Sequence, residues 1–457
     1  RNSVAGEFLG LMMLSTVGMM FVAGARDLLV VFLGIETLSI ALYVLAGFAR
    51  TRLMSNEAAL KYFLLGAFAS GFLLYGIALT YYAVGSTSLP AIADNLSRNA
   101  VRSQGILYAG LALLLIGLGF KAALVPFHQW TPDVYEGAPT PVTAFMATGA
   151  KAAAFAALMR VFIEAFPSMA PQLHPFLTVL AVLTMTVGNI IAISQDSIKR
   201  MLAYSSIAHA GYLLMGVLAA SSAIYRGQIE AAQNSVAAVL FYVLCYALMN
   251  LGAFAILVFL ENARSAQARQ SSTGLAEDGS FRTVTPRLDS VDSEDANLKM
   301  SDLAGLGWQQ PMIAAAFALF LLSLACIPPL AGFFGKFYIF NQTIEQGMWG
   351  LVVAGAINTV ISVYYYLRPV VSMYMNTDTE IAPSAGLISP VSGDVISGNA
   401  IVPSGDAAAT ARPVALPLGA LFAVILCAVA VAAMFILQTA ALSWAQEAAT
   451  SFLKLGN

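Results

Sequence analysis

Long apolar segments divide this chain from its first residues almost to its last. A helix that crosses the ~30 Å hydrocarbon core of a bilayer needs about 20 apolar residues at ~1.5 Å per residue. Such segments predict an all-α polytopic membrane protein with about eleven transmembrane helices. The eleven segments are 5–24, 28–48, 58–83, 105–126, 140–164, 175–195, 201–221, 235–261, 310–341, 347–368 and 415–438.

The composition agrees with a membrane protein and excludes several other classes. Hydrophobic residues make up 59% of the chain and charged residues only 10%, whereas a soluble domain has about 25% charged residues. The net charge of −2 gives no electrostatic footprint for a nucleic-acid partner. The three cysteines and three histidines have no ligand spacing, so we expect no metal, haem or iron–sulfur site in this chain.

Five charged residues nevertheless lie inside apolar segments, namely Glu36, Lys61, Lys121, Lys151 and Lys336. A charge at the bilayer centre costs at least ~2.5–3.5 kcal/mol. Five such residues therefore need a functional reason, and we interpret them as a buried relay that carries protons or ions across the membrane.

Glu36 is the one carboxylate deep in an apolar helix, and Lys61 lies early in the next segment. Helices joined by a short loop usually pack side by side, so we expect Glu36 and Lys61 to pair. Each partner then lowers the cost of burying the other and tunes its pKa. The alternative is a purely structural salt bridge.

Lys121 and Lys151 flank the first irregular segment, which ends in GFKAALVPFHQW. Burial favours the neutral form of a lysine, so either residue is a plausible proton holder. The alternative for both is snorkelling of the amine to the membrane interface. Small residues around Lys151 favour a close helix contact with room for water.

A second irregular segment, LACIPPLAGFFGKFYIF, holds two prolines and two glycines before Lys336. Proline breaks a helix, and irregular backbone at membrane depth is tolerated only beside protein or a wet cavity. The two breaks, five segments apart, predict two inverted five-helix repeats with a Pro-broken helix in each. Lys336 begins the second half-helix, where the helix dipole disfavours a cation; the alternative role is a snorkelling anchor.

His209 lies among small and hydroxyl residues in AYSSIAHAGYLLMG. A histidine shuttles protons near its ordinary pKa, and we include it in the relay. The alternative is a packing residue whose hydrogen bonds are satisfied. Several tyrosines, Tyr43, Tyr204, Tyr242 and Tyr246, could hydrogen-bond to relay waters.

Polar stretches and the two breaks define the predicted organisation. The polar stretches 263–308 and 376–414 are both expected to be solvent-exposed connections. Loops on the side of Arg50, Arg52 and Lys199 carry more Lys and Arg, which places that side in the cytoplasm. The predicted units are a first membrane repeat over 1–164 (helices 1–5), the start of a second repeat over 165–262 (helices 6–8), a polar linker over 263–308, a broken helix and the next helix over 309–375, a polar loop over 376–414, and a final transmembrane helix with its tail over 415–457.

Three stretches of the chain resemble the antiporter-like membrane subunits of respiratory complex I, the bacterial NADH–quinone oxidoreductase, with subunit N as the nearest type. They are GFKAALVPFHQWTPDVYEGAPTPVTAFMATGAKAAAF, SIKRMLAYSSIAHAGYLLMG and LSLACIPPLAGFFGKFYIF. The resemblance implies a fourteen-helix fold of inverted repeats, with this chain beginning at the fourth helix. It also implies relay roles for the pair Glu36 and Lys61, for Lys121 and Lys151 as central lysines, and for Lys336.

By the same resemblance, the chain is a proton-translocating membrane subunit of NADH-quinone oxidoreductase, a multi-pass protein of the cell inner membrane. FMN, iron–sulfur clusters and quinone are expected in partner subunits, with no cofactor and no redox catalysis in this chain. The expected partners are other membrane subunits of complex I and the lipid bilayer. The alternative functions are a subunit of a multisubunit Na⁺/H⁺ antiporter and a structural scaffold, although a scaffold has no reason to bury five charges.

Overall fold

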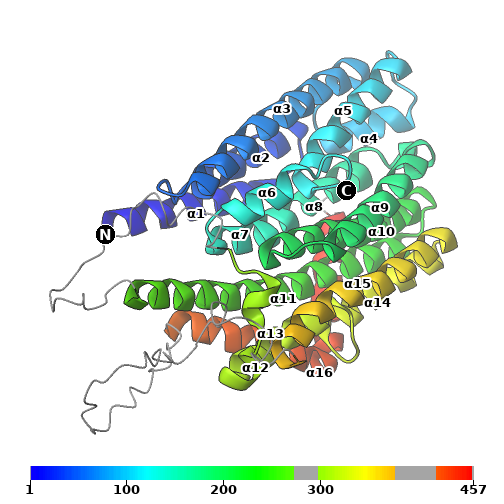
Figure 1. The fold of residues 1–457 in the computed structure, drawn as a ribbon. Helices are drawn as coiled ribbons and strands as arrows, with labels where there is room; N and C mark the ends of the chain where they lie inside the picture. The colour runs from blue at the N-terminus through cyan, green and yellow to red at the C-terminus, as the bar shows by residue number, and fades with distance from the viewer. Residues whose placement is uncertain (1, 272–296, 376–417, 455–457) are drawn as a thin grey trace, which may run out of the picture.

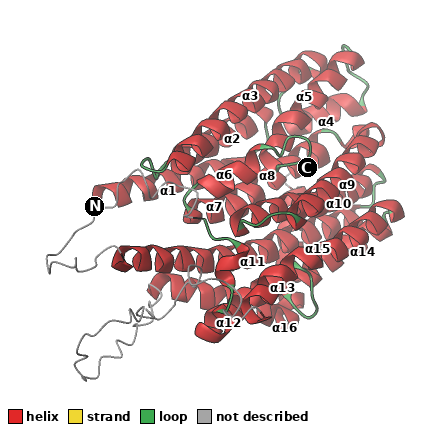
Figure 2. Cartoon of the chain, in the orientation of Figure 1, coloured by secondary structure: helices red, strands yellow, loops and turns green. Residues whose placement is uncertain are grey.

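The computed structural model describes residues 2–271, 297–375 and 418–454 of the chain. The described residues form helices joined by loops and contain no strand (Figure 2). The helices, with π-helical segments η1 and η2 and 3₁₀ turns η3 and η4, are α1 (Asn2–Gly24), α2 (Leu28–Ala46), α3 (Leu53–Val84), α4 (Leu89–Ser97), α5 (Gln104–Ala122), α6 (Trp130–Gly137), α7 (Thr140–Phe145), η1 (Met146–Ala150), α8 (Lys151–Met159), η2 (Arg160–Ala165), η3 (Pro167–Met169), α9 (Ala170–Ile193), α10 (Ile198–Tyr225), α11 (Ile229–Ser271), η4 (Met300–Leu303), α12 (Leu306–Gln309), α13 (Pro311–Leu324), α14 (Ala331–Glu345), α15 (Trp349–Met375) and α16 (Leu418–Lys454).

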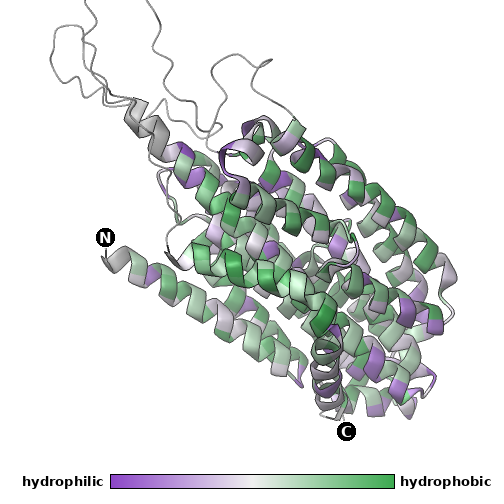
Figure 3. Cartoon of the chain, turned by 90° about the horizontal axis from the view of Figure 1, so that it is seen from below, coloured by the Kyte–Doolittle hydropathy of each residue, from purple (hydrophilic) through white to green (hydrophobic). Residues whose placement is uncertain are grey.

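Within the residues that the structure describes, ten helical stretches are long and apolar enough to cross a membrane. The eleventh predicted segment, 310–341, is divided into the shorter helices α13 and α14, as its prolines led us to expect. Many large apolar residues of the long helices are exposed, and hydrophobic residues predominate along these helices (Figure 3). The prediction of an all-α polytopic membrane protein is therefore confirmed.

Helix α10 lies at the centre of the bundle. Nearly all of its residues are buried, and it packs against α6 and α8 of the first half and against α9, α11, α14 and α15 of the second (Figure 1). Its 28 residues extend for about 42 Å at ~1.5 Å per residue. Side chains on α10 are thus placed to connect the two halves of the bundle.

The two breaks have the same backbone geometry. In the first, Ala123 is left-handed (φ 60°), its amide donates to Phe120, and the Leu124 amide donates to Gly119. In the second, Cys326 is left-handed (φ 64°), its amide donates to Ser323, and the Ile327 amide donates to Leu322. Each is a Schellman motif with a residue other than glycine at its left-handed position. The common motif supports the prediction that the breaks are equivalent parts of a repeat.

Two expectations about segment bounds need correction, namely the extent of the polar linker 263–308 and the end of the last helix. Residues 263–271 of the predicted linker continue α11, and 300–303 and 306–309 form η4 and α12, while 272–296 lie outside the described residues. The predicted loop 376–414 also lies outside them. The stretch before α5 contains the short helix α4, and α16 continues to Lys454 rather than ending at 438.

The second break has room only for a glycine at position 332. A Cβ atom there would lie 1.9 Å from the carbonyl oxygen of Ser323, which is backbone and has no other rotamer. The Gly332 amide also donates to Ser323 Oγ at 3.1 Å. The two half-helices therefore meet at van der Waals contact.

We expect Gly332→Ala to lower the abundance and thermal stability of the assembled protein, since overpacking typically costs about 1–3 kcal/mol or more. The matched control is Gly350→Ala, because a Cβ atom at Gly350 meets nothing within 4 Å. Abundance in purified membranes and the melting temperature in detergent are the measurements. Equal stability of the two variants would contradict this packing argument.

Candidate functional site

Glu36 and Lys61 do not pair, contrary to the sequence prediction. Glu36 on α2 accepts a hydrogen bond from Ser70 of α3. Lys61 lies nine residues earlier on α3, about 13 Å away along the helix axis. Its amine is 2.7 Å from Glu57 and 2.9 Å from Asp133. The packing of α2 and α3 places Glu36 opposite the middle of α3 and turns Lys61 toward α6.

Lys61 lines an open cavity of about 190 Å³ where α3 and α10 begin. Arg200 faces it across the cavity and donates to Asp133 at 2.8 Å and to Glu136 at 2.9 Å. Lys61 is half-exposed, with 43% of its side chain accessible, so it is not a deeply buried lysine as predicted. The cavity is a polar, charged recess at one end of the bundle.

Lys121 is buried in the last turn of α5, where the helix dipole favours a cation. Its amine donates to Ser39 Oγ at 2.7 Å and lies 3.1 Å from the Tyr62 hydroxyl. A cavity of about 10 Å³ lies between Lys121 and Ser70, the hydrogen-bond partner of Glu36, and Ser39 also lines it. That volume is close to the minimum that holds one water molecule.

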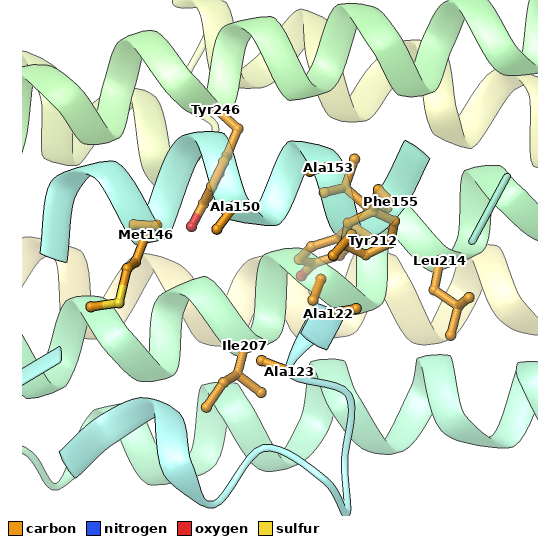
Figure 4. Close-up of a cluster of buried hydrophobic side chains, with 14 of the residues drawn as sticks. Ala122, Ala123, Met146, Ala150, Ala153, Phe155, Ile207, Tyr212, Leu214 and Tyr246 are labelled. Atoms are coloured by element: carbon orange, nitrogen blue, oxygen red, sulfur yellow. The ribbon is translucent and has the colours of Figure 1, made fainter. Parts of the chain in front are cut away.

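Lys151 is buried where η1 meets α8, and its amine donates to the hydroxyl and carbonyl oxygens of Ser206 on α10. The ring of Tyr246 lies 5.8 Å from the amine. Figure 4 shows Tyr246 extending from α11 toward Ala150, next to Lys151 in sequence, with Met146 nearby. The burial of Lys121 and Lys151 argues against the snorkelling alternative for both.

His209 lies one turn along α10 from Ser206. Its Nδ1 contacts the Tyr242 hydroxyl and its Nε2 lies 3.1 Å from the Tyr366 hydroxyl. Tyr366 also contacts Ser205 Oγ. The histidine therefore has satisfied hydrogen bonds, as the packing alternative required, and both of its partners are tyrosine hydroxyls, which can donate as well as accept a hydrogen bond.

Lys336 lies in the second turn of α14, not at its start as predicted, and so lies beyond the first turn, where the helix dipole acts. Its amine is 3.8 Å from the centre of the Tyr212 ring and 3.5 Å from Thr359 Oγ1. Tyr212 is on α10, one turn beyond His209, and its hydroxyl is 3.2 Å from the same Thr359 oxygen. Polar side chains of α10 thus lead from Lys151 through Ser206, Ser205 and His209 to the aromatic face under Lys336.

Three buried lysines, Lys121, Lys151 and Lys336, have no carboxylate within 4 Å among the described residues. Hydroxyl oxygens accept from an ammonium group and also donate to a neutral amine. A carboxylate partner, by contrast, would hold the lysine in its charged form. None of the three lysines is therefore held in its charged form by a carboxylate partner among the described residues.

Sequence reasoning missed several charged residues that the structure buries. Lys199 was counted as a loop charge, but it is buried, donates to the Ala138 carbonyl at 2.9 Å and lies 3.9 Å from Glu261. When Lys199 is left out of the count, the short loops on the two sides of the membrane no longer differ clearly in their number of Lys and Arg residues. Arg160 and Glu164 form a buried ion pair in η2. The i, i+4 spacing of that pair was a signal that could have found it.

Comparisons with known proteins agree with this arrangement. The family model described as NADH:quinone oxidoreductase/Mrp antiporter, TM, matches residues 25–362. NADH-quinone oxidoreductase subunit N of Trichlorobacter lovleyi is 45% identical over 407 residues, which cover 87% of this chain and 75% of the relative. Subunit N 1 of Sorangium cellulosum is 45% identical over 405 residues, which cover 87% and 72%. The chain belongs to the family of NADH-quinone oxidoreductase subunit N.

Solved structures show the same fold. Respiratory complex I from Thermus thermophilus contains a chain with 35% identity and a TM-score of 0.68, and the match covers 96% of this chain and 79% of that one. The Mrp complex from a Dietzia species matches with a TM-score of 0.72 at 20% identity, covering 97% and 77%, which is a likeness of fold alone. The chain is thus a multi-pass membrane subunit of an oxidoreductase complex, as the sequence predicted.

Proposed function

We propose that this chain translocates protons across the bacterial inner membrane, driven by electron transfer from NADH to quinone in partner subunits that hold FMN and iron–sulfur clusters. The observation that carries the proposal is the line of hydroxyl, imidazole and aromatic groups on α10 between Lys151 and Lys336. Protons move along such a line by exchange between neighbouring groups, while each lysine stores one proton between steps.

In this mechanism, uptake begins at the cavity around Lys61 and Arg200, which is open at the end where α10 begins. Tyr62, next to Lys61 on α3, faces Lys121. Trp130 stacks on Tyr62 with ring centres 4.6 Å apart and so fixes the orientation of the Tyr62 ring. Glu36, through Ser70 and the small cavity, supplies a negative charge near Lys121. A change in that charge would favour uptake or release of the Lys121 proton.

A Na⁺/H⁺ antiporter subunit is the second candidate, supported by the fold shared with the Mrp complex. The 45% identity with subunit N relatives favours the redox-driven pump. NADH-driven acidification of proteoliposomes that contain the assembled complex supports the pump. Sodium–proton exchange without NADH would instead support the antiporter.

Glu36→Gln tests the proposed function directly. Glutamine retains an oxygen that accepts from Ser70 but cannot ionise, so we expect the complex to assemble and its proton pumping per NADH to fall several-fold. Pumping in reconstituted vesicles is the measurement, and Glu447→Gln, an exposed position on α16, is the control. Unchanged pumping by Glu36→Gln would remove Glu36 from the relay.

A further inference from the structure

Helix α15 carries an exposed apolar stripe that ends at an arginine. Residues three and four apart share one face of a helix, and the stripe consists of Val353, Ile357, Val360 and Tyr364, each more than half exposed. Arg368 lies one turn beyond Tyr364. The rise from the start of α15 to Arg368 is about 28 Å, close to the ~30 Å thickness of the hydrocarbon core. The arginine therefore lies at the boundary between the hydrocarbon and the headgroups of a bilayer.

A cavity of about 530 Å³ opens beside Arg368, between α15 and the 3₁₀ turn η4. Nearby on α12, Trp308 is 72% exposed and donates its indole N–H to the Tyr374 carbonyl at 3.2 Å. Exposed tryptophans of this kind are typical of the membrane interface, so the cavity lies at headgroup depth. Apart from Arg368, its lining residues are Met300, Ser301, Tyr364, Leu367, Val371 and Ser372.

The guanidinium of Arg368 is held in place by the end of α9 and the residues that follow it. It donates to the carbonyl oxygens of Ile193 and Gln195, and to Asp196 at 3.3 Å. These contacts with described residues use three of the five guanidinium N–H groups. The Asp196 side chain is 82% exposed, and an exposed ion pair is weak and screened by salt. Arg368 is thus oriented by its neighbours while much of its positive charge stays available to an anion.

Capping of α9 would explain the arginine by itself, but not the cavity beside it or the apolar stripe that leads to it. We propose that this cavity binds the headgroup of an anionic phospholipid. Arg368 holds the phosphate, Ser301 on the opposite wall donates its hydroxyl to a phosphate oxygen, and the acyl chains lie along the stripe of α15. Basic pockets between membrane helices are a known type of site for anionic lipids. This inference does not depend on the proposed proton relay.

The size and charge of the cavity favour this occupant over others. Its volume falls within the ~300–1,000 Å³ of small-ligand sites, whereas a spanning helix of a partner subunit, ~10 Å wide and ~30 Å long, occupies on the order of 2,400 Å³. Arg368 is the one charged residue among the described residues that line the cavity. The lining therefore offers a partner to a phosphate group but none to the ammonium group of a zwitterionic headgroup.

Photo-crosslinking of the assembled complex in phosphatidylcholine vesicles tests the proposal. A phosphatidylglycerol analogue and a phosphatidylcholine analogue, each with a diazirine in the acyl chain near the glycerol, are compared, and mass spectrometry identifies the modified peptides of this chain. We expect the phosphatidylglycerol analogue to label Tyr364–Ser372 and Met300–Ser301 severalfold more than the other analogue. Equal labelling by the two analogues would show bulk lipid only. No labelling by either would assign the cavity to a protein neighbour, and both results would overturn the proposal.

Variants separate lipid binding from a structural role of the arginine. Arg368→Gln should lower labelling by phosphatidylglycerol severalfold, whereas Arg98→Gln, which removes another arginine of an exposed ion pair, should leave it unchanged. Because Arg368→Gln also removes the contacts to the end of α9, Val371→Trp provides an independent measurement. It fills the cavity, retains Arg368 and should lower labelling to a similar extent. Normal labelling of either variant in complex of normal abundance would contradict the assigned site.

Discussion

Lys336→Arg is expected to abolish proton pumping almost as completely as Lys336→Ala. An arginine keeps the positive charge and stacks well on an aromatic ring, so it preserves the contact with Tyr212. It does not release a proton at any working pH, because the pKa of its guanidinium exceeds ~12. A fixed cation would therefore tolerate the change, and a proton carrier would not. We expect losses on the order of tenfold or more for both variants, in line with the loss of a general acid–base group.

The measurement is NADH-driven acidification of vesicles, with assembly checked by native gel electrophoresis. Lys299→Arg serves as the matched control, because Lys299 is an exposed lysine outside the polar line. If Lys336→Arg pumps at the normal rate while Lys336→Ala does not, Lys336 is a structural charge and not a carrier.

Lys151→Ala is expected to reduce quinone reduction as well as pumping, again on the order of tenfold. The Lys151 amine bridges α8 to the hydroxyl and carbonyl oxygens of Ser206, and its removal takes away the first group of the line from Lys151 to Lys336. In a coupled machine, a blocked translocation step also stalls electron transfer. NADH:quinone reductase activity per assembled complex is therefore the decisive measurement.

Ser206→Ala gives a graded comparison for Lys151. It removes the hydroxyl acceptor but leaves the backbone carbonyl that the amine also contacts, so we expect a smaller loss. A normal reductase rate in Lys151→Ala at normal abundance would exclude the residue from the relay. A fall in abundance alone would assign it a structural role.

The fold class, the approximate number of membrane spans and the positions of the two helix breaks were predictable from the sequence. Each of them depends on local composition. Long apolar segments have few alternatives to a membrane helix, and the consecutive prolines Pro328 and Pro329 disfavour a continuous helix. Buried charges such as Lys121, Lys151 and Lys336 were visible for the same reason, since a lysine inside an apolar segment contrasts with its neighbours. Their roles as proton carriers stay predictions until the variants are measured.

Side-chain partners were decided only by the tertiary structure. A membrane helix that is apolar on all sides carries no periodic signal for the face that it turns toward its neighbours. Sequence spacing therefore paired Glu36 with Lys61. Helix packing instead places Glu36 against Ser70 and Lys61 against Asp133. The hydrogen bond from buried Lys199 to the Ala138 carbonyl and that from Ser235 to Gln342 of α14 likewise depend on helix rotation and contact. The sequence by itself determined which segments enter the membrane and which charges go with them, because transfer into lipid is a property of each segment. Only the packing of α10 between the two halves decided how those charges are connected.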